Sequence, residues 1–182
     1  MAEPPILQLP DVDPTHLAVV IRGILSEDLA QAERLRGAAQ SLARADTQET
    51  TGRFLALLDV AYLVASVDGL SGDERDGILR LFESVTDSVL ERDQLEHHFH
   101  ALDERRASTS AAEQLAAAAG DLRDDDRPNA IRFAAAIAMS DGWLGDAELG
   151  ALYELGGYLS IPADRAREQV EQLIQRVEGR LR

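Results

Sequence analysis

The fold is decided by a stretch that occurs twice, as Val67-Asp68-Gly69-Leu70-Ser71-Gly72-Asp73-Glu74 and as Ser140-Asp141-Gly142-Trp143-Leu144-Gly145-Asp146-Ala147-Glu148. In each copy an apolar segment ends at Asp-Gly, and a segment with Glu near its start follows. Gly adopts the left-handed conformation that ends a helix, and Asp and Glu cap helix starts. The repeat therefore predicts two helix–Asp-Gly–helix hairpins, related by a pseudo-twofold axis and packed together.

The rest of the chain also has helical periodicity and helix-start signals. Asp13-Pro14 begins a first helix, and Ser110 with Glu113 has the capping-box pattern. The proline-containing residues 1–13 are expected to form an extended lead-in. Residues 14–182 are expected to form one all-α domain, a compact bundle of about seven to nine helices, with repeat units at approximately 47–86 and 128–160. We expect helices at 27–44, 47–67, 92–106 and 130–140. Further helices are expected to begin after Asp13, Ser71, Ser110 and Gly142, and one more at Pro162. No strands are expected.

Composition and charge exclude several classes of function. The net charge of -15 at pH 7 argues against nucleic acid as a partner, because phosphate binding needs a basic surface. The chain contains no Cys, so it has no disulfide, thiolate metal site or Cys nucleophile. It also lacks a phosphate-binding Gly-rich loop, a nucleophile elbow and a His pair with metalloprotease spacing. We therefore expect a protein that is not an enzyme.

No targeting or membrane-spanning segment is expected. The N-terminal residues lack the basic and apolar regions of a signal peptide. The longest apolar stretch, residues 54–67, is too short to cross a bilayer and contains Asp59. A cytoplasmic protein without a transmembrane segment is the expectation.

The acidic residues of the two turns are the best candidates for a binding site. If the repeats face each other, their carboxylates offer hard oxygen ligands to a divalent cation such as Ca²⁺, Mg²⁺ or Mn²⁺. An EF-hand is excluded, because Ile137 and Met139 stand where oxygen ligands are needed. The alternative is that the carboxylates only cap helices. The candidate ligands are Asp68, Glu74, Asp141 and Glu148, with Asp73 and Asp146 as secondary candidates.

These two segments, residues 58–69 with Glu74 and residues 134–142 with Glu148, resemble the signature of TerB-like domains. That family includes the tellurite-resistance protein TerB and the N-terminal domain of the DnaJ-like membrane protein DjlA. The resemblance covers roughly residues 47–180. It implies an all-α bundle of two repeats, no enzymatic activity, and a role in divalent-metal sensing or in membrane-linked stress complexes. It assigns the family's acidic positions to Asp68, Glu74, Asp141 and Glu148, although the first turn is one residue shorter than the second.

Two other groups of polar residues have structural and functional interpretations. Asp59 lies inside the most apolar helix, and Arg132 holds the corresponding place in the second repeat, so we predict an ion pair between them. The strip formed by Asp93, His97, His100 and Glu104 has the spacing of a transition-metal site, but such strips are more often solvated helix faces. His98 lies beside the apolar stripe of that helix and is expected to be partly packed.

Two functional hypotheses remain, and they belong to different classes. The first is a cation-binding sensor that uses the acidic turns and is linked to tellurite or general stress response. The second is a passive interaction module with a protein partner, in which the turns serve only as caps. Trp143, directly after Asp141-Gly142, is either an anchor for that partner or a core residue. The oligomeric state is left open.

Overall fold

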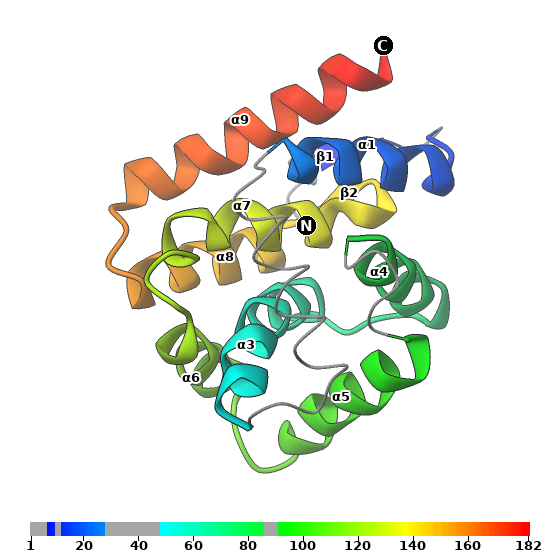
Figure 1. Cartoon of the computed structure of the whole chain (residues 1–182). Helices are drawn as coiled ribbons and strands as arrows, with labels where there is room; N and C mark the ends of the chain where they lie inside the picture. The colour runs from blue at the N-terminus through cyan, green and yellow to red at the C-terminus, as the bar shows by residue number, and fades with distance from the viewer. Residues whose placement is uncertain (1–6, 10–11, 28–47, 86–90) are drawn as a thin grey trace.

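The computed structural model describes residues 7–9, 12–27, 48–85 and 91–182, and these form eight α-helices, one short 3-10 helix and two very short strands (Figure 1). The predicted helix at 27–44 lies outside the described residues. The helices are α1 (Pro14–Ser26), α3 (Gln48–Ala65), α4 (Gly72–Val85), α5 (Arg92–Arg105), α6 (Ala111–Asp121), α7 (Arg127–Ala138), α8 (Asp146–Tyr158) and α9 (Ala163–Leu181), with the 3-10 helix η1 at Met139–Asp141. The all-α prediction is confirmed.

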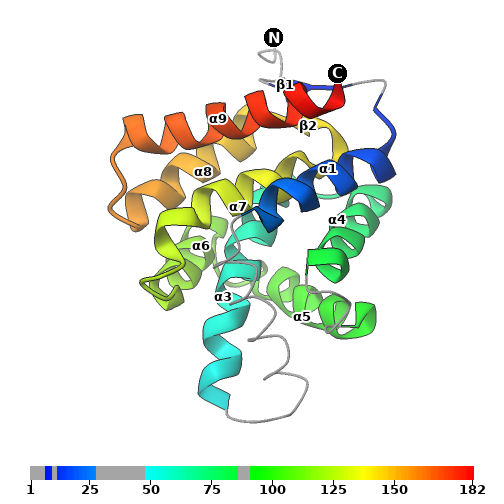
Figure 2. The same cartoon turned by 45° about the horizontal axis from the view of Figure 1, so that its top comes forward.

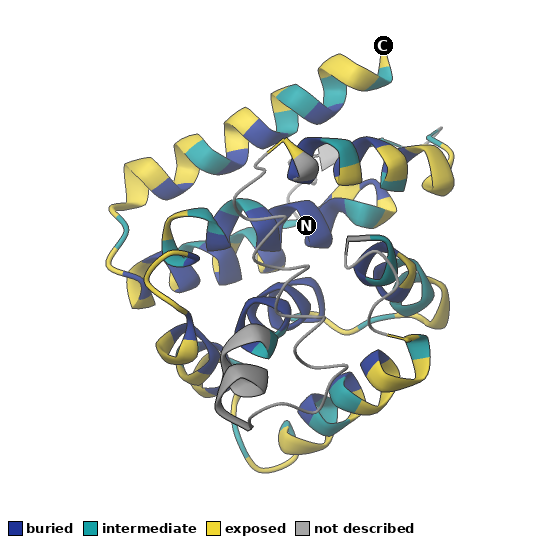
Figure 3. Ribbon diagram, in the orientation of Figure 1, coloured by how far each residue is buried: buried dark blue, intermediate teal, exposed yellow. Residues whose placement is uncertain are grey.

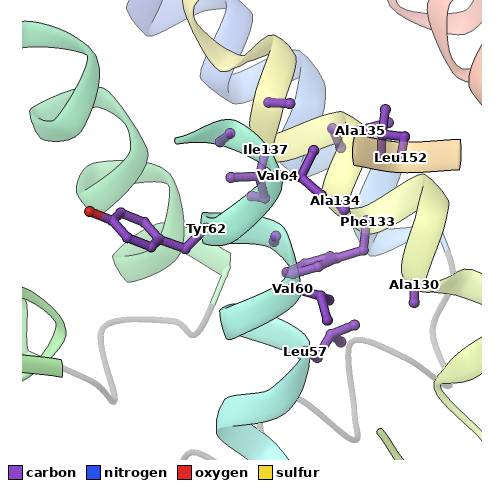
Figure 4. Close-up of a cluster of buried hydrophobic side chains, with 14 of the residues drawn as sticks. Leu57, Val60, Tyr62, Val64, Ala130, Phe133, Ala134, Ala135, Ile137 and Leu152 are labelled. Atoms are coloured by element: carbon purple, nitrogen blue, oxygen red, sulfur yellow. The ribbon is translucent and has the colours of Figure 1, made fainter. Parts of the chain in front are cut away.

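The first helices of the two repeats, α3 and α7, form the centre of the bundle. They make the most extensive helix–helix contact of the described residues, and α6 also packs on α3. Their apolar character on all sides explains this position, because such a helix is stable only when other helices surround it. Residues 133–139 are all buried, and Phe133 lies among Leu57, Val60 and Val64 of α3 in Figure 4.

The outer helices are amphipathic and cover this centre. The last helix, α9, packs on α7, α1 and α8, and α1 in turn packs on α4 (Figures 1 and 2). Each outer helix buries one stripe and exposes the other, as the alternation of dark blue and yellow along α9 shows in Figure 3. In α9 the buried stripe consists of Ala166, Val170, Leu173 and Val177.

Local capping explains where several helices begin. The Asp13 carboxylate accepts hydrogen bonds from the backbone N–H groups of Thr15 and His16 at 2.7 and 3.0 Å, and Pro14 is the first residue of α1. At the start of α6, the Ser110 hydroxyl oxygen accepts from the Glu113 N–H, and the Glu113 carboxylate accepts from the Ser110 N–H. Both starts lie where the sequence predicts them.

A two-stranded antiparallel pairing departs from the expectation of no strands. Strand β1 (Leu7–Gln8) pairs with β2 (Trp143–Leu144), and the Leu9 N–H donates to the Gly142 carbonyl at 2.9 Å. Strands of two residues are too short to produce the period-two pattern by which strands are recognised in a sequence. The pairing matters for function because it places residues 7–9 directly on the second Asp-Gly turn.

Candidate functional site

The two Asp-Gly turns have the backbone geometry that their sequences predict. Gly69 and Gly142 have φ values of 97° and 85°, in the left-handed region that side chains with a Cβ rarely adopt. At the second turn the Asp141 carboxylate accepts a hydrogen bond from the Trp143 N–H at 2.8 Å. The turns thus end α3 and the α7–η1 segment and redirect the chain into α4 and α8.

The two glutamates serve as caps. The Glu74 carboxylate accepts from the Ser71 N–H at 2.6 Å, and the Ser71 hydroxyl oxygen accepts from the Glu74 N–H at 3.3 Å. In the second repeat the Glu148 carboxylate accepts from the Gly145 N–H at 2.7 Å. These bonds engage one oxygen of each carboxylate, so capping and ligand binding are compatible uses of the same residue.

The tertiary structure brings the four primary candidates together. Asp68, Glu74, Asp141 and Glu148, two from each repeat, line one pocket of about 380 Å³. The pocket lies where the ends of α3 and η1 meet the starts of α4 and α8, and apolar residues of these segments also line it. Trp143 lines it as well, and 43% of its surface is exposed.

Among the described residues, the charged side chains that line this pocket are all acidic. Burial raises the pKa of Glu148 to about 7; the hydrogen bond from Gly145 opposes this shift, and the charges of Asp141, Asp68 and Glu74 add to it. Partial desolvation also raises the pKa of Asp141, although this residue is exposed to solvent, and the charges of Glu74 and Asp68 act in the same direction. All four carboxylates therefore interact, and added positive charge in the pocket would stabilise them.

The secondary candidates are placed differently. Asp73 and Asp146 lie outside the lining of the pocket, and they are exposed to solvent, as Asp68 and Asp141 of the lining also are. Within the described ranges, no three Asp, Glu or His side chains are positioned to hold one ion together. A cation would therefore have to draw the four carboxylates inward by side-chain rotation, and water would complete its coordination.

Asp59 contacts a different polar side chain from the one predicted. His98 of α5, which is partly buried as expected, places Nε2 2.5 Å from Asp59 Oδ1, whereas the sequence suggested Arg132. Counting positions along the two repeats could not identify His98, because α5 lies outside both repeat units. The strip on α5 is solvated: His100 and Glu104 are 3.5 Å apart and both are largely exposed.

A polar network beside the first turn was missed at the sequence level. The Tyr62 hydroxyl donates to Asp103 at 2.9 Å, and Arg75 donates to both the Tyr62 oxygen at 2.8 Å and Asp103 at 2.6 Å. Tyr62 is 1% exposed, and its ring stacks on Phe99 with centroids 4.2 Å apart. The signal in the sequence was a tyrosine within an apolar helix, because a buried hydroxyl needs a hydrogen-bond partner.

None of the helices in the described ranges combines the length and apolar character of a membrane-spanning helix. Comparison with characterised protein sequences and with solved structures gave no significant match. A family model, described as tellurite resistance protein TerB, matches residues 54–172, which is well over half of the chain and contains both acidic turns. The chain therefore belongs to the TerB family.

Proposed function

We propose that this protein is a non-enzymatic sensor domain that binds a divalent cation in the pocket between the two acidic turns. The observation that carries the proposal is the convergence of four carboxylates, two from each repeat, on one pocket. Oxygen donors of this kind suit Ca²⁺, Mg²⁺ or Mn²⁺, whose preferred ligands are carboxylates, carbonyls and water. The raised pKa values of Glu148 and Asp141 support the proposal, because a bound cation would relieve their mutual repulsion.

Binding in this pocket would connect the two halves of the bundle. Asp68 and Glu74 belong to the α3–α4 unit, and Asp141 and Glu148 belong to the α7–α8 unit. A cation that draws ligands from both units acts as a crosslink between the starts of α4 and α8. The cation would thereby change the stability of the fold and the surface around Trp143, which is how a sensor domain signals without catalysis.

A second candidate function is a passive interaction module, and the exposed Trp143 favours it. An aromatic side chain that is 43% exposed beside four carboxylates offers a partner both apolar contact and negative charge. The partner would be a protein with a basic segment, in line with the membrane-linked complexes that the family resemblance implies. In this case the carboxylates remain caps, and no ion is required.

The family description connects TerB proteins with tellurite resistance. For this chain we extend the proposal to a cytoplasmic role in tellurite or general stress response, exercised through cation binding and a protein partner. Loss of tellurite tolerance in cells that carry Asp141→Asn, with normal protein levels, would support this extension.

The experiment that separates the two functions is the thermal unfolding midpoint, measured in EDTA and then with an excess of each cation. A ligand at about 100 times its Kd stabilises the folded state by roughly 2.7 kcal/mol. The cation sensor predicts a shift with at least one ion that Asp141→Asn abolishes. Asp146→Asn is the matched control, because it removes the same charge outside the pocket and should keep the shift. No shift with any ion would favour the interaction module.

A further inference from the structure

The two sides of the acidic pocket are supported by different parts of the fold. The second turn is held by strand β1 and the residue after it, where the Leu9 N–H donates to the Gly142 carbonyl. The first turn has no such strand in the described residues, and a Cβ on Gly69 would meet nothing within 4 Å, so its shape must be set by neighbouring helices.

The C-terminal end of α5 contacts both arms of that first turn. On the incoming arm, the Arg106 guanidinium donates to the Ser66 carbonyl at 2.8 Å and also to the Ser66 hydroxyl. The same Ser66 carbonyl accepts the Gly69 N–H at 3.1 Å, the bond that closes the turn. Arg106 thus holds the Ser66 carbonyl that accepts the bond closing the turn, and Ser66 lies two residues before Asp68.

On the outgoing arm the contact is made through Arg75. Its guanidinium bonds to Asp103 at 2.6 Å and to the Tyr62 hydroxyl, and Tyr62 itself bonds to Asp103. Arg75 directly follows Glu74 in the first turn of α4. Tyr62 is buried and its ring stacks on Phe99, so the hydroxyl to which Asp103 and Arg75 bond is fixed in position.

We propose that Asp103 and Arg106, at the end of α5, are positioning residues that hold Asp68 and Glu74 at the separation at which they face the second turn. The inference rests on the proposed cation site and deepens it, because it identifies the support of its first half. Groups that orient ligands without touching the metal typically change its affinity by ten- to a hundredfold when they are altered.

The test compares Asp103→Asn with Asp76→Asn in the full chain. Asp76 also joins α4 to α5, through Arg92, and it has a similar exposure, so both variants remove one charge from the same helix pair. Calorimetric titration with Mn²⁺ should show affinity reduced by roughly tenfold or more in Asp103→Asn, and nearly unchanged in Asp76→Asn. Arg106→Lys keeps the charge but loses the two-pronged contact with Ser66, so it should also weaken binding. Equal affinities in Asp103→Asn and Asp76→Asn would overturn the inference.

A second readout works without any ion. Amide hydrogen exchange of residues 68–74 in EDTA should accelerate in Asp103→Asn and Arg106→Lys relative to the amides of α8, and it should not do so in Asp76→Asn. If the wild type binds no cation, the proposed function fails, yet the exchange data still decide whether α5 positions the turn. Unchanged exchange at 68–74 in both variants would refute the positioning role itself.

Discussion

The pKa of Glu148 makes the stability of this protein depend on pH in a predictable direction. A carboxyl whose pKa is higher in the folded than in the unfolded chain destabilises the fold in its charged form, so stability falls as pH rises from the unfolded pKa towards the folded one. For Glu148 these values are 4.5 and about 7. The cost is about 1.4 kcal/mol at pH 5.5 and about 3.4 kcal/mol at pH 8.5, so this residue alone should lower the free energy of unfolding by about 2 kcal/mol across that interval.

The substitution Glu148→Gln tests this reasoning. The amide oxygen can still accept the hydrogen bond from the Gly145 N–H, while the charge is removed. At pH 5.5 the folded Glu148 is mostly protonated, so the amide replaces a neutral cap there, and the effect of the charged cap at higher pH is already contained in the pKa of about 7. We therefore expect the variant to gain about 2 kcal/mol relative to wild type between pH 5.5 and 8.5, and to be the more stable of the two at pH 8.5.

The assay is urea unfolding in EDTA, followed by circular dichroism at several pH values for both proteins. Contributions from the rest of the chain are common to the two proteins and cancel in the difference. Residues with a lowered pKa, such as Asp13 and Glu113, lose their contribution only at more acidic pH. A stability difference between variant and wild type that stays constant from pH 5.5 to 8.5 would refute the account of the pocket's electrostatics.

Two further predictions concern the supports of the site. Gly142→Ala should destabilise the fold more than Gly69→Ala. Both substitutions place a Cβ at positive φ, which costs about 1–2 kcal/mol. Only at Gly142 would the new Cβ also lie 3.2 Å from a backbone atom, the Leu9 carbonyl oxygen. Thermal unfolding in EDTA measures this, and equal midpoints would contradict it. Tyr62→Phe should lower the free energy of unfolding by about 1.5–3 kcal/mol, because it keeps the ring but removes the bond to Asp103; urea unfolding with no change in midpoint would contradict that.

The turns and caps could be predicted because their chemistry is local. Asp-Gly ends a helix, and Ser71 with Glu74 is recognisable as a capping box within four residues. The position of the four carboxylates around one pocket could also be predicted from the sequence, since the repeat implies that equivalent turns face each other once α3 and α7 pack together. The repeat thus predicts both the centre of the fold and the lining of the candidate site.

The partners of interior polar residues could not be predicted in the same way. Tyr62 and Asp103 are 41 residues apart, and Asp59 and His98 are 39 apart, so their contacts depend on how α5 crosses α3. Hydrophobic periodicity indicates which face of α5 is buried, but it does not specify the depth or angle of the helix crossing. The secondary candidates Asp73 and Asp146 could not be separated from the pocket residues for a related reason: neighbouring residues of a first helical turn point in different directions.

The most direct test of the central claim is the stoichiometry and location of cation binding by calorimetric titration of the wild type, Asp68→Asn and Asp141→Asn with Ca²⁺, Mg²⁺ and Mn²⁺. The two variants remove one carboxylate from each repeat. If the acidic turns form one shared site, the wild type will bind one ion per chain, and each variant alone will abolish or greatly weaken that binding. Binding that survives either substitution, or no binding in the wild type, would contradict a shared site.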